Sequence, residues 1–105
     1  MEMRVTLRYF DGCPNWEIAL GRVREVLAAS GPAVPEVELE RVPTEEEAER
    51  LGFRGSPTVL VDGVDPFADE TMPVGLACRV YRTERGLEGA PSLDQLKAVL
   101  AAPTA

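Results

Sequence analysis

The stretch that decides the fold is Asp11-Gly12-Cys13-Pro14-Asn15-Trp16. Before it, residues 3–10 alternate apolar and polar side chains, which predicts a β-strand. After it, apolar residues recur at helical spacing as far as about Ser30, where a Gly-Pro pair predicts the end of a helix. Pro14 stands where a helix favours proline, at its first position. Cys13 is therefore expected at the corner where a strand ends and a helix begins.

Beyond this corner, predicted strands and helices follow one another, so that the whole chain has the order β-α-β-α-β-β-α. Strands joined by helices are expected to run parallel, and the last two strands can form an antiparallel pair. The predicted fold class is α/β, a four-stranded mixed sheet with helices on both faces. An irregular insert is expected over 63–77, which is rich in Pro and Gly. The remaining elements are expected as strands over 37–42, 58–61 and 78–83, and as helices that follow the capping boxes Thr44–Glu47 and Ser92–Gln95.

Length and composition limit the chemistry that is open to this chain. With 105 residues, it is expected to form a single domain. It contains no histidine, which removes Ser-His-Asp and Cys-His catalysis and His-ligated zinc. The net charge of −7 argues against nucleic-acid partners.

The same composition argues against a membrane partner. No apolar run approaches the ~20 residues of a membrane-spanning helix, so none is expected. The charged N-terminus, Met1-Glu2-Met3-Arg4, leads straight into predicted structure and does not resemble a secretory signal. A cytoplasmic location is therefore expected.

Cys13 is the candidate reactive group. At the beginning of a helix, unpaired backbone N–H groups and the positive end of the helix dipole stabilise a thiolate. The alternative is a structural role, because free cysteine is among the most buried residue types. The position of Cys13 at a strand-to-helix corner, directly before proline, favours the reactive interpretation.

Three segments carry a resemblance to a known family: Cys13-Pro14-Asn15-Trp16, Leu51-Gly52-Phe53-Arg54-Gly55-Ser56-Pro57-Thr58 and residues 89–97. With the order of elements, they make the chain resemble the thioredoxin-like superfamily over nearly all of residues 1–105. The resemblance implies a thioredoxin-like fold with a cis Ser56–Pro57 bond packed against Cys13. It also implies that the backbone of Ser56 is free to pair with an extended substrate.

The chain departs from the family's Cys-x-x-Cys motif, because Trp16 occupies the position of the second cysteine. Monothiol relatives rely on a small thiol to resolve the mixed disulfide, so the resemblance implies thiol–disulfide chemistry through Cys13 alone. The implied partners are a disulfide-bearing protein or a low-molecular-weight thiol, and no cofactor is expected. Trp16 is expected to anchor the core or, alternatively, to cover the thiol. Pro14, Trp16, Ser56, Pro57 and Asp11 are the candidate binding residues around the cysteine.

Cys78 is the other cysteine of the chain. If it begins a strand that runs antiparallel to 58–61, five residues of strand place it about 16 Å from the site, which favours a core position. If the insert instead folds back over Cys13, the two thiols meet and suit a soft ion such as Cu(I) or a mercuric ion. A thinner resemblance, to organomercurial lyases, would then give Asp11 the role of an acid. Three functions stay open: thiol–disulfide redox chemistry, a non-catalytic module that binds a protein or a soft metal, and carbon–mercury cleavage.

Overall fold

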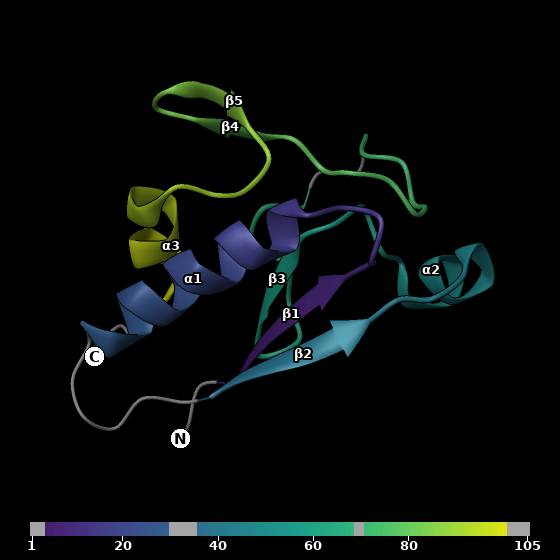
Figure 1. Ribbon diagram of the computed structural model, residues 1–105, viewed down its shortest axis with the longest axis horizontal. Coiled ribbons are helices and arrows are strands. Elements are labelled where there is room, and N and C mark those ends of the chain that lie inside the picture. The colour runs from purple at the N-terminus through teal and green to yellow at the C-terminus, as the bar shows by residue number, and fades with distance from the viewer. Residues whose placement is uncertain (1–3, 30–35, 69–70, 101–105) are drawn as a thin grey trace.

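The computed structural model describes residues 4–29, 36–68 and 71–100. Met3 and the expected end of the first helix at Ser30 lie outside these ranges. The structure has mixed α/β character, with a sheet at its centre and helices packed against it (Figure 1). The elements are β1 (Val5–Tyr9), α1 (Asn15–Ala28), β2 (Val37–Arg41), α2 (Glu45–Leu51), β3 (Thr58–Val61), β4 (Tyr81–Thr83), β5 (Gly86–Glu88) and α3 (Leu93–Leu100).

The central sheet has three strands in the order β2-β1-β3. β1 runs parallel to β2 and antiparallel to β3, with Val5 opposite Val61 and Arg8 opposite Thr58. Alternate residues of β1 point to one face, and α1 and α3 cover that face (Figure 1). The core that results contains Val5, Leu7, Ala19, Leu20, Val23, Val26, Leu27, Val59, Ala90, Leu96 and Leu100.

The predicted four-stranded sheet is wrong. Of the predicted strand over 78–83, only Tyr81–Thr83 is a strand, and it pairs with Gly86–Glu88 in a separate hairpin. A local turn closes this pairing, and Gly86 supplies the positive φ of 109° that the turn requires. The backbone of β4 is therefore satisfied by its neighbour in sequence rather than by β3.

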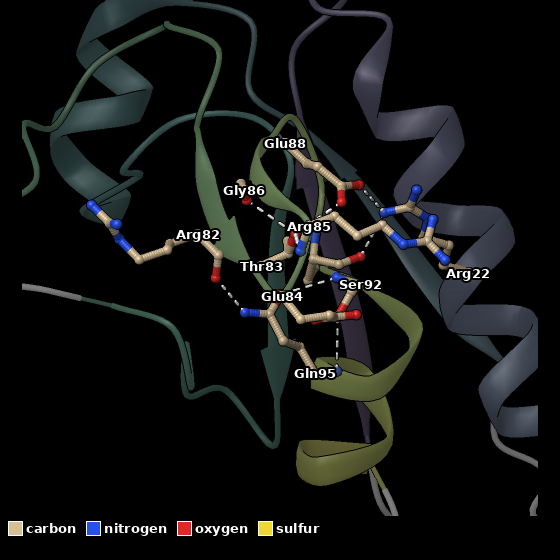
Figure 2. A network of polar contacts seen from close by, with 10 residues as sticks. Arg22, Arg82, Thr83, Glu84, Arg85, Gly86, Glu88, Ser92 and Gln95 are labelled. Carbon is tan, nitrogen blue, oxygen red and sulfur yellow. Dashed lines mark hydrogen bonds and ion pairs between the residues drawn. The ribbon is translucent and has the colours of Figure 1, made fainter.

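Polar contacts attach the β4–β5 hairpin to two helices (Figure 2). From α1, Arg22 donates to Glu88 at 3.2 Å and to the carbonyl oxygen of Pro91 at 3.0 Å. Near α3, the Gln95 amide donates to the carbonyl oxygen of Arg82 at 2.7 Å. These bonds fix the direction in which the chain enters β4 from the insert.

The prediction that helix-joined strands run parallel is also wrong for β3. α2 has seven residues and is about 10 Å long, so it does not return the chain along the whole sheet. It lies beyond the end of β2 (Figure 1) and packs against a small cluster of Val42, Ala48 and Phe53. The chain therefore turns back and enters β3 antiparallel to β1, and α2 does not cover the second face of the sheet.

The predicted helix signals are confirmed. The Thr44 hydroxyl accepts a hydrogen bond from the Glu47 N–H at 3.1 Å, and Gly52 ends α2 with a left-handed φ of 66°. Ser92 and Gln95 form a reciprocal capping box before α3, with bonds of 3.0 and 3.1 Å.

None of the described helices is long and apolar enough to cross a membrane.

Candidate dithiol site at the beginning of α1

Cys13 lies at the corner between β1 and α1, as predicted. Its N–H donates to the carbonyl oxygen of Phe10 at 3.2 Å, which closes the turn after the strand. Pro14 follows as the N-cap of α1, one position earlier than predicted, and is exposed. The Cys13 side chain is completely buried, and its thiol donates to the carbonyl oxygen of Ser56 with a sulfur–oxygen distance of 3.6 Å.

Ser56 and Pro57 meet Cys13 because β1 and β3 are antiparallel. The end of β1 therefore lies beside the beginning of β3, and the residues just outside both strands come together. The Ser56–Pro57 peptide bond is cis, and both side chains are fully buried. The hydroxyl of Tyr81 donates to the carbonyl oxygen of Pro57 at 2.5 Å, so the segment that enters β4 also contacts this loop.

Cys78 lies against Cys13, which corrects both the predicted distance of about 16 Å and the predicted core position. The insert returns past the beginning of β3, where Cys78 forms an isolated parallel bridge with Ser56. Cys13 donates to the carbonyl oxygen of the same Ser56 that Cys78 bridges, so the two free cysteines converge on one residue. Cys78 is exposed, whereas Cys13 is buried beneath it. The prediction failed because residues 78–80 are not part of a strand paired with β3.

The contact changes the acid–base behaviour of the exposed thiol. The interaction with Cys13, slight burial and the electrostatic influence of Cys13 all raise the pKa of Cys78. The exposed thiol therefore holds its proton more tightly than an ordinary cysteine does.

Arg79, the residue after Cys78, is a buried arginine that sequence patterns did not indicate. The Arg79 guanidinium donates to Asp65 at 2.7 Å and to the carbonyl oxygen of Phe67 at 2.8 Å, both in the insert. It also donates to the Thr58 hydroxyl at 3.3 Å and lies 4.7 Å from the centre of the Tyr81 ring. A basic residue in an alternating strand pattern is normally read as exposed, which is why its role was missed.

The other candidate residues have structural contacts. Trp16 is half-buried and stacks on Tyr9 with ring centres 4.2 Å apart, packed against the main core, which supports the anchoring interpretation. Asp11 is exposed and pairs with Arg41 at 2.7 Å. Its carboxylate is thus engaged at the surface and not with a cysteine.

The donor set of the site consists of two sulfur atoms. The described part of the chain contains no group of three or more His, Cys, Asp or Glu side chains that could hold a metal ion. Among the described residues, Cys13 and Cys78 are thus the side chains offered to a metal here, and two sulfur ligands suit a soft ion.

Comparisons with protein families, with curated proteins and with solved structures find no match to this chain.

Proposed function

We propose that this protein is a thioredoxin-like thiol–disulfide redox protein whose redox couple is Cys13 and Cys78. The convergence of both cysteines on Ser56 carries the proposal: Cys13 donates to its carbonyl oxygen and Cys78 bridges its backbone, and a disulfide requires two thiols that lie together. Cys78 has the role of the second cysteine of the Cys-x-x-Cys motif, a position that Trp16 occupies in this sequence. The proposal thus replaces chemistry through a single cysteine with an internal dithiol.

Two features support the thioredoxin-like part of the proposal. Cys13 directly precedes Pro14, the N-cap of the helix that follows the first strand, and its thiol donates to the carbonyl oxygen of Ser56. The cysteine thus lies next to the N-terminal end of α1, in a chain that has no histidine. We place the reaction in the cytoplasm, where thiols are kept reduced between cycles.

Mild oxidation of the whole protein tests this proposal. The reduced chain is equilibrated in glutathione buffers of increasing oxidation, quenched with a thiol-blocking reagent and analysed by mass spectrometry. We expect a two-electron transition from a doubly blocked to an unblocked monomer, with a peptide map that links Cys13 to Cys78. The variant Cys13→Ser should stop at a mixed disulfide with glutathione, whereas Cys78→Ser, whose remaining thiol is buried, should form neither a mixed nor an internal disulfide. A wild-type chain that also stops at mixed disulfides would overturn the proposed couple.

A soft metal ion is the second candidate ligand of the same pair. Two sulfurs in contact, without a third side-chain ligand among the described residues, favour two-coordinate binding of Cu(I) or a mercuric ion. Carbon–mercury cleavage has less support, because the carboxylate of Asp11 pairs with Arg41. Titration with Cu(I) against a chromophoric chelator tests the metal alternative: one ion per chain, lost in either Cys→Ser variant, would support it, and no competition with the chelator would exclude it.

A further inference from the structure

The backbone beside Cys13 is already paired within the chain. The N–H of Ser56 donates to the carbonyl oxygen of Ala77 at 2.8 Å, and its carbonyl oxygen accepts from the N–H of Arg79 at 2.8 Å. Both groups that an extended polypeptide would need for strand-like pairing are therefore occupied. This differs from the expectation that the backbone of Ser56 is free for a substrate.

Residues 77–79, which pair with the backbone of Ser56, are held by an ion pair of Arg79 and by close packing against Gly55. The Arg79 side chain is 2% exposed and pairs with Asp65, and loss of one partner from such a pair leaves a buried charge. Gly55 also approaches the segment closely, since a Cβ built on it would lie 3.0 Å from both the Ala77 carbonyl oxygen and the Arg79 Cβ. A polypeptide that competed for Ser56 would have to displace these contacts.

The two cysteines also differ in their exposure to solvent. Cys13 is 0% exposed, and Cys78 is exposed directly beside it. A reagent from solution therefore meets the sulfur of Cys78. A small disulfide needs only that sulfur, whereas a protein disulfide on an extended strand also needs the backbone position that 77–79 fills.

We infer that the disulfide substrate of this site is a low-molecular-weight disulfide, and that residues 77–79 occupy the position an extended polypeptide substrate would take. This inference rests on the proposed function. Cys78 gives up its proton as its sulfur attacks one sulfur of R–S–S–R, the S–S bond breaks, and the released RS⁻ takes up a proton in its place. Cys13 then attacks the Cys78 sulfur, a second RSH leaves with the proton of Cys13, and the chain holds a disulfide. Two low-molecular-weight thiols reduce that disulfide and are themselves oxidised to a disulfide, so two electrons pass in each half-cycle.

Rapid-mixing kinetics of the fully reduced whole protein test the inference. The probes are bis(2-hydroxyethyl) disulfide as the small substrate and insulin as the polypeptide substrate. Each rate constant is divided by that of dithiothreitol with the same probe, which removes the intrinsic reactivity of each disulfide. We expect the normalised rate for the small disulfide to exceed that for insulin at least tenfold. Cys78→Ser should abolish the reaction, and Cys13→Ser should stop it at a mixed disulfide that releases one RSH.

A variant that loosens the segment gives an independent readout. Asp65→Asn removes the charge that pairs with Arg79, and we expect it to raise the insulin rate relative to that of the small disulfide. Equal normalised rates in the wild type, or a faster reaction with insulin, would overturn the inference even if the Cys13–Cys78 disulfide forms. A chain that forms this disulfide but reacts with neither probe would also overturn it. A chain that forms no internal disulfide would overturn the proposed function itself.

Discussion

Breaking the buried ion pair between Arg79 and Asp65 should cost several kcal/mol of stability, and Arg79→Ala tests this. The Arg79 side chain is 2% exposed and that of Asp65 is 14% exposed. Truncation leaves the carboxylate in a poorly solvated position, and breaking a buried pair in this way costs about 3–5 kcal/mol. Because Asp65 keeps some contact with water and a hydrogen bond from the Phe67 N–H, we expect the lower end, about 3 kcal/mol. For a domain of this size that lowers Tm by roughly 12–24 °C.

Thermal and urea unfolding, followed by circular dichroism, measure this loss. Arg50→Ala is the matched control, because Arg50 pairs with Glu47 at the surface with side chains that are 66% and 39% exposed. Water screens that pair, so its loss should change the stability very little. If Arg79→Ala does not fold, Arg79→Lys keeps the charge but loses the planar donor pair, and should give a smaller loss. A change no larger than that of Arg50→Ala would refute the reasoning.

Three other predictions follow from the same region. Gly55→Ala should destabilise the fold by about 1–3 kcal/mol in urea unfolding, because Gly55 has a φ of 104° and no room beside Arg79; wild-type stability would contradict this. Burial raises the pKa of Tyr81, so the folded state keeps the phenol proton at a pH where the unfolded state has lost it. The free energy of unfolding of the wild type should therefore fall above about pH 10. It should fall less steeply with pH in Tyr81→Phe, and equal slopes would argue against this. Cys13→Ala should lower the pKa of Cys78 toward its usual range, which the pH dependence of iodoacetamide alkylation measures, and an unchanged profile would show that the two thiols are not coupled.

Local patterns predicted the elements close to the candidate site. The corner at Cys13, the capping box at Ser92 and the ending of α2 at Gly52 depend on contacts between residues three or four positions apart. Periodicity likewise placed β1 and β3 to within a few residues. The number of strands in the sheet was not predictable in this way, because an alternating segment can pair with any neighbour that its connection allows.

The position of Cys78 is the point at which prediction from the sequence failed. It depends on the path of residues 63–77, whose Pro and Gly residues indicate irregular backbone but not its direction. The assumed continuous strand over 78–83 placed the thiol far from Cys13, whereas the chain bridges Ser56 first and forms β4 afterwards. The ion pair of Arg79 was not predicted either, because its partner Asp65 lies in the same insert.

The sequence by itself determined that a cysteine lies at the corner between the first strand and the first helix, that no histidine is available as a base, and where α2 begins and ends and α3 begins. These properties come from composition and from interactions within one turn of chain. Only the tertiary structure decided that β3 runs antiparallel to β1 and that Cys78 reaches Cys13. It also decided that residues 77–79 occupy the backbone of Ser56. In each case, segments far apart in the sequence pair their backbone groups or bury a charge against one another. Which segments meet depends on the path of the whole chain.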